Sequence, residues 1–503
     1  MTVDGALASR VEAWIDTAGH EPERVRDLVE SVLAAGFAPG TVRLILDTGA
    51  EGAADSLAVL AADTGVSTLD GRAAALDDRL DQTEAEFLFV VRWGTVEPDL
   101  LPKAVGFLDR FPSVSIAYGD SRTAQGAPLL RPVLSPIRLR NNDYLGPVVV
   151  GRVADVRELG GFDERARRAQ VLDLALRAID RGLAVALIPD GLAVEQLSGE
   201  EFAGTSEAQA AIVRTRLEEA GVQAEVEEIA PFVRRVRYAV TGDPLVSIVI
   251  PTRGGSAEIA GSDRVLVVEA VRGIVERSTY TNLEFVIVAD RETPEPVIAE
   301  LEAIAGDRLK LVAWEAPFNF SGKMNRGAIA ASGEYLLLLN DDVEVVTDDW
   351  IDHLLGLAQQ PGVGIVGAQL YFEDSTLQHA GQIYTGGVAG HAAFGWPGGR
   401  DDSIASLKVD HEVSGVTAAC AMVSRQLFLE VGGFSLAFPG NYNDVDLNMK
   451  IRISGRSAVF SPWARLYHFE SKTRDPRILD SDIATLRARW SRRMQIELYS
   501  RML

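Results

Sequence analysis

The sequence has a single cysteine, a shortage of basic residues and no long apolar run. Cys420 has no possible disulfide partner in the chain, so nothing indicates an oxidising compartment. The 49 Lys and Arg residues against 72 Asp and Glu give a net charge of -23. That charge argues against nucleic acid as a partner, because phosphate backbones are bound through clustered positive charge. No apolar run reaches membrane-spanning length, and residues 1–16 are too acidic for a signal peptide. We therefore expect an acidic cytoplasmic protein.

The chain is long and apolar enough for more than one domain. Its 503 residues, 47% of them hydrophobic, can bury two sizeable cores. We predict four parts, which are a first domain at 1–196, a helical linker at 197–242, a second domain at 243–475 and a C-terminal amphipathic helix at 476–503.

One segment of the second domain is unusually informative. Residues 334–342 read EYLLLLNDD, a short apolar run that ends in an amide and two carboxylates. Such a run predicts a strand buried on both faces, with its polar end at the rim of a sheet. Carboxylates at that rim suit a divalent cation that stays partly hydrated and binds a substrate diphosphate. A solvated turn or a helix cap would explain the same residues, and the neighbouring segments decide between these interpretations.

The preceding segments predict a parallel unit of strand, helix and strand. Residues 244–252 are a second buried-strand pattern, 267–276 have apolar residues at helical spacing, and 283–290 form a third apolar strand that ends in an acid. Parallel strands bring their carboxyl ends to one edge, so Asp290 and the Pro251 turn should lie beside residues 340–342. That edge is where open α/β sheets bind ligands.

With these motifs in place, the sequence resembles a known family. The order SIVIPTRG, VIVADRET, PFNFSGKMNRG, GEYLLLLNDDVE, QHAGQIY, VTAACAMV, EVGGF, NDVDL and LYHFES is similar to the inverting nucleotide-sugar glycosyltransferases of family 2, which have the GT-A fold. Within that family the sequence looks most like bacterial enzymes of O-antigen and cell-surface polysaccharide synthesis, often rhamnosyltransferases. The resemblance runs from about residue 244 to residue 471.

The resemblance implies a role for each matching residue. Asp342 matches the last acid of the metal-binding DxD element, which would hold Mn2+ or Mg2+ against the donor, while Asn340 replaces its first acid. His468 matches a histidine that completes the metal site, although a core histidine at a strand end is the alternative. The remaining assignments are to donor binding (Pro251, Thr252, Arg253, Asp290, Asn325, Asn340, Asp341) and to the acceptor side (Gln378, His379, Thr417, Asn443, Asp446).

The resemblance also implies that Asp444 is the catalytic base. Inverting transfer is a single displacement by an acceptor hydroxyl, so a carboxylate is needed to take its proton. Residues 443–447 read NDVDL, and a helix start there would turn Asp444 and Asp446 in different directions. Asp446 is then an acid at a helix start, favoured by the dipole. The glycine-rich segment 386–399, which contains His391, is either a mobile lid or an ordinary surface loop.

The first half of the chain repeats the order of motifs in the second half. Residues 86–91, 158–162, 42–47 and 186–189 parallel 334–339, 430–434, the strand ending at Asp290, and 459–462. The fold class we predict is therefore α/β, with two GT-A-like domains in tandem and a C-terminal helix. Where the second copy has residues 340–342, the first has Arg92, Trp93 and Gly94, and Gln170 and Val171 replace Asn443 and Asp444. The first domain should therefore be degenerate and non-catalytic, serving to bind an acceptor or partner or purely as support.

We expect a nucleotide-sugar donor and a glycan or lipid-linked glycan acceptor as partners. The C-terminal stripe of Ile483, Leu486, Trp490, Met494 and Leu498 has arginines around it, so peripheral membrane contact, docking on its own domain and an oligomer contact all remain open. Two other functions are carried as alternatives. A nucleotidyltransferase making an activated sugar would need a stronger phosphate loop than residues 253–255 provide. A non-catalytic glycan-binding scaffold would not need the acids and histidine of the second copy.

Overall fold

The computed structural model describes residues 5–46, 53–195, 205–259, 261–400, 406–470 and 477–501. The chain divides into two compact units, and the first ends at Arg235 where the second begins at Val236. Asp47, the junction at 196–204 and the boundary near 475 fall outside the described residues, so the predicted domain limits remain predictions. None of the described helices combines the length and apolar content that crossing a bilayer requires.

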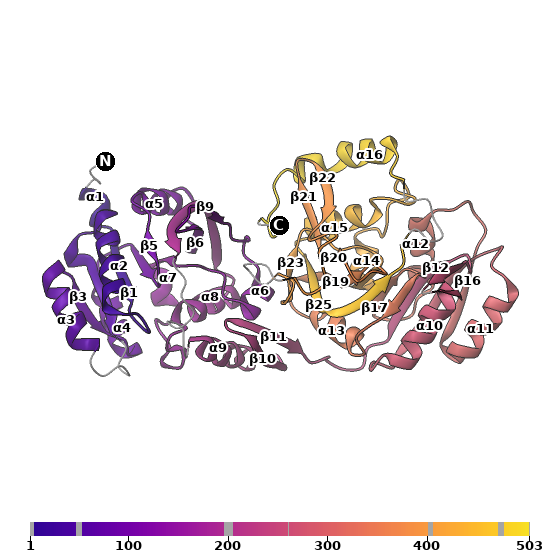
Figure 1. Ribbon diagram of the computed structural model, residues 1–503, viewed down its shortest axis with the longest axis horizontal. Helices are drawn as coiled ribbons and strands as arrows, with labels where there is room; N and C mark the ends of the chain where they lie inside the picture. The colour runs from indigo at the N-terminus through magenta and orange to yellow at the C-terminus, as the bar shows by residue number, and fades with distance from the viewer. Residues whose placement is uncertain are drawn as a thin grey trace. The chain divides into compact units, whose positions relative to one another are not determined.

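The first unit is a mixed sheet with helices packed against it, as Figure 1 shows. Its main path runs β3-β2-β1-β4-β8-β6-β9-β5, with parallel pairing among β1 to β4 and antiparallel pairing of β8 with both its neighbours. Its elements are α1 (Gly5–Ala8), β1 (Val11–Asp16), α2 (Pro22–Ala34), η1 (Pro39–Thr41), β2 (Val42–Leu46), α3 (Ala53–Thr64), β3 (Ser67–Asp70), α4 (Ala73–Gln82), β4 (Phe87–Val91), β5 (Thr95–Val96), α5 (Leu100–Arg110), β6 (Val114–Thr123), β7 (Pro128–Leu129), α6 (Pro136–Asn141), β8 (Val148–Arg152), α7 (Val153–Glu158), η2 (Glu164–Ala166), α8 (Gln170–Asp180), β9 (Ala184–Glu195), α9 (Thr205–Glu219), β10 (Ala224–Ala230) and β11 (Val233–Tyr238).

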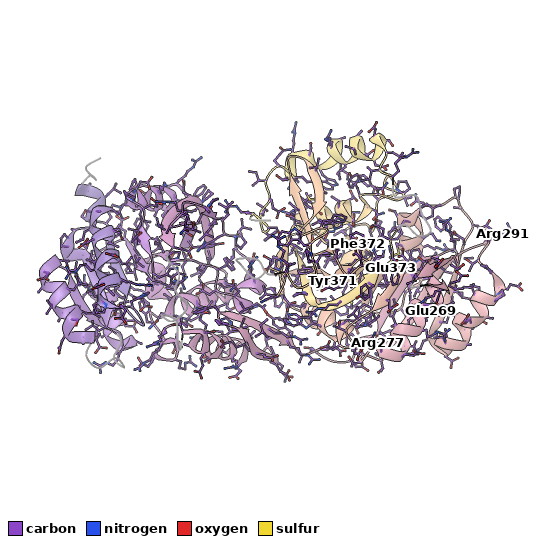
Figure 2. All side chains as sticks on the ribbon, viewed as in Figure 1. Glu269, Arg277, Arg291, Tyr371, Phe372 and Glu373 are labelled. Atoms are coloured by element: carbon purple, nitrogen blue, oxygen red, sulfur yellow. The ribbon has the colours of Figure 1, made fainter. Side chains whose placement is uncertain are left out.

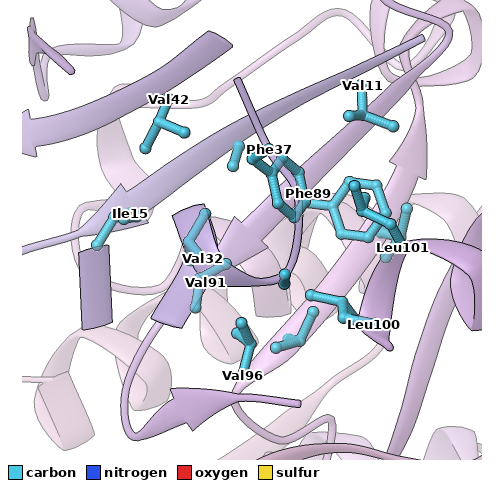
Figure 3. Close-up of a cluster of buried hydrophobic side chains, with 14 of the residues drawn as sticks. Val11, Ile15, Val32, Phe37, Val42, Phe89, Val91, Val96, Leu100 and Leu101 are labelled. Atoms are coloured by element: carbon cyan, nitrogen blue, oxygen red, sulfur yellow. The ribbon is translucent and has the colours of Figure 1, made fainter. Parts of the chain in front are cut away.

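The core of the first unit forms where alternate strand residues meet the apolar stripes of α2 and α5. Val11, Ile15, Phe89 and Val91 point to one side of the sheet and pack with helix residues, as Figure 3 shows. The α9 helix, which falls in the predicted linker, packs against α8, where Arg216 Nε donates to Asp173 at 2.6 Å. The predicted linker is thus partly a helix of the first unit, and it continues into the β10–β11 hairpin, whose second strand crosses the boundary between Arg235 and Val236.

The second unit has a sheet with the path β16-β15-β12-β17-β24-β19-β25-β18. Its elements are β12 (Val246–Thr252), β13 (Ser256–Ile259), β14 (Ser262–Val265), α10 (Leu266–Arg277), β15 (Leu283–Asp290), α11 (Glu295–Ala305), η3 (Gly306–Arg308), β16 (Leu309–Trp314), α12 (Phe320–Ala330), β17 (Tyr335–Leu339), β18 (Val343–Val345), α13 (Trp350–Ala358), β19 (Val363–Tyr371), β20 (Leu377–His379), β21 (Gln382–Thr385), β22 (Val388–His391), β23 (His411–Val413), β24 (Cys420–Ser424), α14 (Arg425–Glu430), α15 (Asn443–Ile453), β25 (Ser457–His468), α16 (Asp480–Trp490) and η4 (Ser491–Arg493).

The central strands of this unit are buried on both faces, as their apolar runs predict. Leu336 and Leu338 of β17 pack with α12, α14 and α15, while Leu337 points to the opposite face and is also fully buried. The helix α10 ends at Arg277, which is labelled in Figure 2. The Arg277 side chain donates to the carbonyl groups of Val345 and Val346. The α/β class predicted from sequence is confirmed. The order of the eight strands in the main path is the same in both units, position by position.

The C-terminal helix is shorter than predicted. The apolar stripe predicts one helix through Leu498, but α16 ends at Trp490 and the chain continues through a single 3₁₀ turn. The helix ends there because the following residues bond elsewhere, with the Met494 and Gln495 carbonyls accepting from the backbone amides of Gly387 and Gly386.

Candidate active site

A cavity of about 630 Å³ lies at the carboxyl ends of β12, β15 and β17 in the second unit. The start of α15, the end of β25 and the β21–β22 hairpin complete its wall. All but four of the residues predicted for the site line this cavity, namely Pro251, Thr252, Arg253, Asp290, Asn340, Asp341, Asp342, Thr417, Asn443, Asp444 and His468.

Asp342, which directly precedes β18, lies beside His468 at the end of the antiparallel strand β25. Val343 pairs with His468, and the His468 Nε2 lies 3.1 Å from Asp342 Oδ1. Asn340 Nδ2 is 3.0 Å from the same ring nitrogen, and the other nitrogen, Nδ1, contacts Gln378 Oε1 at 2.7 Å. Burial opposes a charge on His468, but the Asp342 carboxylate outweighs it and the pKa of the ring is raised. Gln378 does not line the cavity, and its contact fixes which His468 nitrogen faces inward.

Asp341 is the second carboxylate at the end of β17. Its Oδ2 accepts a hydrogen bond from Thr252 Oγ1 at 2.6 Å, which ties β12 to β17 at the rim. Burial, with the neighbouring Asp342 charge, raises the pKa of Asp341 to about 6. Two adjacent buried carboxylates repel, so this end of the cavity favours a bound cation.

Lys323 is a cavity residue that the sequence reasoning missed. It lies on α12, whose first turn is capped by Asn319, with the Asn319 side chain accepting from the Gly322 amide at 2.8 Å. The Lys323 Nζ is 2.9 Å from Asp290 Oδ1 and donates to the Thr252 carbonyl at 2.9 Å. Only 2% of Lys323 is exposed. A lysine in the first turn of a helix that follows a strand was the available signal in the PFNFSGKMNRG motif.

Asp444 enters the cavity from the first turn of α15, as its position in NDVDL predicts. Its Oδ2 accepts from Gln382 Nε2 at 2.9 Å and its Oδ1 from the Val445 amide at 2.8 Å. Burial raises the pKa of Asp444, while the nearby His391 opposes that rise. A half-buried carboxylate with a raised pKa is a stronger base than an exposed one, which suits proton removal.

His379 and His391 form a chain that starts at the backbone of Thr417. The Thr417 amide donates to His379 Nε2 at 3.3 Å, and His379 Nδ1 lies 2.8 Å from His391 Nδ1. Burial lowers the pKa of His379 well below its usual value, so this ring is neutral, and the pKa of His391 is lowered as well. An imidazole nitrogen that accepts leaves the proton on the other nitrogen, so His379 donates from Nδ1 and His391 carries its proton on Nε2. His391 therefore brings an N–H donor to the cavity wall, although His379 itself does not line the cavity.

Two predicted site residues lie away from the cavity. Asn325, predicted for donor binding, instead holds the turn at Phe434, accepting from its amide and donating to its carbonyl, both at 2.8 Å. Asp446, predicted for the acceptor side, is fully buried and accepts from Trp490 Nε1 at 2.9 Å. The cause is helical geometry, since residues two apart on α15 point to different sides.

The corresponding edge of the first unit has different chemistry. Arg92, at the end of β4, pairs with Asp143 at 2.6 Å and donates to the Gly146 carbonyl at 2.9 Å. Arg92 also borders a smaller cavity of about 200 Å³ with Val171 at the start of α8. No carboxylate stands at the positions of Arg92, Trp93 and Gly94, nor at Val171.

The residues at the end of β17 fit a divalent cation only as a partial ligand set. Among the residues that the structure describes, no group of three or more Asp, Glu, His and Cys side chains gathers as a metal cluster. Asp342 and His468 are in contact, with Asn340 beside them. A cation that keeps several waters and binds substrate phosphates needs few protein ligands, so this donor set is compatible with Mg2+ or Mn2+.

Comparisons with known proteins find a family match in the second unit and similarity to relatives that extends into the first. Residues 247–432 match the model of Glycosyl transferase family 2. The chain is 33% identical over 407 residues to "Uncharacterized protein y4gI" of Sinorhizobium fredii, covering 75% of this chain and 43% of that protein. It is also 33% identical over 428 residues to "O-antigen biosynthesis protein RfbC" of Myxococcus xanthus, covering 82% of this chain and 32% of that protein. The chain thus spans less than half the length of these relatives.

A solved structure, the mannosyltransferase PcManGT from Pyrobaculum calidifontis, is similar over 46% of this chain and 59% of its own, with 16% identity and a TM-score of 0.33. That similarity is too weak to support an argument about this chain. The match to the family model covers the strands and helices that build most of the cavity. Residues 247–432 of the second unit are therefore similar to the glycosyltransferases of family 2.

Proposed function

We propose that the second unit transfers a sugar, with inversion and with a divalent metal, from a nucleotide-sugar donor to a glycan or lipid-linked glycan acceptor. The proposal rests on one observation, which is that three features line the same cavity. These are the Asp290 edge suited to a nucleoside, the Asp342 and His468 pair, and the Asp444 carboxylate. A cavity of about 630 Å³ is within the range that holds a ligand of this size.

The donor would lie along the carboxyl ends of the strands. Asp290, beside Arg253 and Thr252, is suited to hydrogen bonds with the base and ribose. Asp342 and His468, with Asn340, would hold Mn2+ or Mg2+ near the diphosphate. When bound, such an ion supplies positive charge that stabilises the leaving diphosphate. Gln378 would keep His468 turned toward it.

The acceptor would enter beside Asp444. Its hydroxyl oxygen forms a bond to the anomeric carbon while the bond to the diphosphate oxygen breaks, and the hydroxyl proton passes to Asp444. General-base help of this kind is worth ~10²–10⁴ in rate. The raised pKa of Asp444 supports this role, and the His391 N–H provides a donor for an acceptor oxygen.

The first unit is proposed to be a degenerate copy that does not catalyse. The shared strand order supports a repeat of one fold, and the loss of carboxylates at Arg92, Trp93, Gly94 and Val171 supports the loss of activity. Its role would be to bind an acceptor or partner, or to support the second unit.

The biological setting is proposed from the relatives. The name of the Myxococcus xanthus relative supports a role in O-antigen or other cell-surface polysaccharide synthesis. The proposal places this synthesis in the cytoplasm, at the inner face of the membrane. The predicted membrane or oligomer contact of the C-terminal stripe loses its apolar part, because Leu486, Trp490 and Met494 are buried in a cluster with Val445 and Met449. Peripheral membrane binding by α16 would therefore depend on its basic residues.

The proposal is tested by donor hydrolysis. Purified protein with Mn2+ should slowly release nucleoside diphosphate from its own nucleotide sugar, and a thermal-shift screen of nucleotide sugars, including rhamnosyl donors, would find that donor. Asp444→Asn should retain the donor-induced shift and lose transfer, while Glu300→Gln, which changes a surface carboxylate paired with Arg272, should change neither. Release of pyrophosphate would favour a nucleotidyltransferase. Failure to turn over any nucleotide sugar would favour a binding scaffold.

A further inference from the structure

The β21–β22 hairpin carries two polar side chains at its open end. Gln382 and His391 are directly opposite each other in its register, and both border the cavity. The closed end is fixed to the C-terminal segment, because the Gly386 and Gly387 amides bond to the carbonyls of Gln495 and Met494 at 3.1 and 2.9 Å. The hairpin and the C-terminal segment lie together in Figure 1. The open end is therefore a fixed part of the cavity wall.

A hydrogen-bond chain runs from this hairpin to Asp444. The Tyr384 hydroxyl donates to Gln382 Oε1 at 2.6 Å, and Gln382 Nε2 donates to Asp444 Oδ2 at 2.9 Å. Tyr384 is 1% exposed and Gln382 is 2% exposed, so solvent does not compete for these groups. Burial raises the pKa of Tyr384 well above its usual value, which keeps the hydroxyl protonated. With the hydroxyl donating to the amide oxygen, the amide nitrogen has to face Asp444.

The far end of the chain is anchored by Glu497. Its Oε2 accepts from the Tyr384 amide at 2.7 Å and from Ser414 Oγ at 3.0 Å. Its Oε1 accepts from the backbone amides of Tyr499 and Ser500 at 2.9 and 3.1 Å. Glu497 is 9% exposed and bonds to three separate segments. Tyr384 is thereby held in place at its backbone amide as well as at its hydroxyl group.

We propose that Gln382 is a positioning residue for Asp444 and that Tyr384, anchored by Glu497, sets the direction of its amide. This inference rests on the proposed function, in which Asp444 is the base. A neutral N–H donor stabilises the ionised carboxylate, so Gln382 keeps Asp444 able to accept a proton in spite of its burial. The same bond fixes the rotation of the carboxylate relative to the acceptor hydroxyl, and small errors of placement are costly in catalysis.

The test removes the hydroxyl that orients the amide. Tyr384→Phe keeps the ring and frees Gln382 to turn its oxygen toward Asp444. We expect kcat to fall about tenfold or more, the scale of one hydrogen bond to a charged group, with KM for the donor within about twofold of wild type. The acidic limb of the pH profile should move to higher pH, because the carboxylate loses a donor. Gln382→Glu places a second carboxylate against Asp444 and should move that limb further in the same direction.

Two comparisons make the outcome decisive. Tyr371→Phe removes a hydroxyl that lies outside the cavity and accepts a hydrogen bond from Gln369, and it should leave both kcat and the pH profile unchanged. Wild-type turnover combined with unchanged kcat and pH profiles in Tyr384→Phe and Gln382→Glu would overturn the positioning role and leave the proposed function standing. Absence of turnover in the wild type, with every nucleotide sugar that raises its melting temperature, would overturn the proposed function and this inference with it.

Discussion

Lys323 allows the electrostatics of the cavity to be tested through stability. Its ammonium group is buried between the Asp290 carboxylate and the Thr252 carbonyl, and it also lowers the pKa of Asp341. Lys323→Met keeps most of the side-chain volume and removes the charge. The substitution leaves Asp290 without its cation and the Thr252 carbonyl without a donor.

The size of the effect follows from burial. Removing one partner of a buried ion pair costs roughly 3–5 kcal/mol, because the other charge is left unpaired in a poorly solvated place. The Asp290 side chain keeps 18% of its exposure, so water compensates in part and we expect a loss of about 3 kcal/mol, at the lower end. The double variant Lys323→Met/Asp290→Asn has no unpaired charge and should recover most of that loss. Asp290→Asn alone leaves the Lys323 charge unpaired and costs energy as well, so the cycle should show a coupling energy of at least about 2 kcal/mol.

The assay is urea unfolding of the wild type, both single variants and the double variant at neutral pH, with unchanged slopes as a check on the folded state. Arg272→Met, which breaks the exposed pair with Glu300, is the matched control and should lose at most about 1 kcal/mol. A loss of less than about 1 kcal/mol in Lys323→Met, or a double variant no more stable than the single, would refute the reasoning. Donor binding should also weaken, since Lys323 borders the cavity.

Three further outcomes follow from the same geometry. Folding favours the protonated form of Asp341, because its pKa of about 6 lies above the usual 3.8. The free energy of unfolding of the metal-free protein should therefore fall as pH rises through about 6. Urea titrations of Asp341→Asn should show a flatter dependence on pH. Asp342→Asn should reduce both the thermal shift caused by Mn2+ and the rate of donor hydrolysis. Arg92→Met should destabilise the first unit by roughly 3–5 kcal/mol, because the Asp143 side chain is 2% exposed, yet hydrolysis per folded molecule should persist. Loss of that hydrolysis would contradict a non-catalytic first unit.

The parts of the fold that sequence could predict are those set by local apolar pattern. The run at 283–290 coincides with β15, and the helical spacing at 267–276 lies within α10, one residue shorter at each end. The end of α16 was not predictable in this way. Its stripe continues past Trp490, but bonds between the chain near Met494 and the hairpin glycines, more than a hundred residues earlier, determine where the helix stops.

The site residues show the same difference between positions set by local pattern and positions set by contacts with distant segments. Residues at strand ends, such as Asp290 and Asp342, could be placed together because parallel strands share an edge. Lys323 and Gln382 were missed, although both lie in motifs given above, because their roles depend on partners that approach from distant segments. Asp444 and Asp446 point in different directions from the start of α15, as the spacing predicts, and Asp446 is buried rather than exposed on the acceptor side.

Comparison of the two units indicates that the fold does not depend on the acids at the end of β17, which are therefore available to bind a ligand. The strand order is the same in both, so the fold itself does not require carboxylates at the end of the fourth strand in the sheet path. In the first unit that position is Arg92, which is paired with Asp143 and satisfies a carbonyl. In the second unit that position is Asn340, which is followed by Asp341 and Asp342. Burial, together with the neighbouring Asp342 charge, raises the pKa of Asp341 to about 6. A cation bound there would relieve the repulsion between these carboxylates, so metal binding and stability should be linked in the second unit and independent in the first.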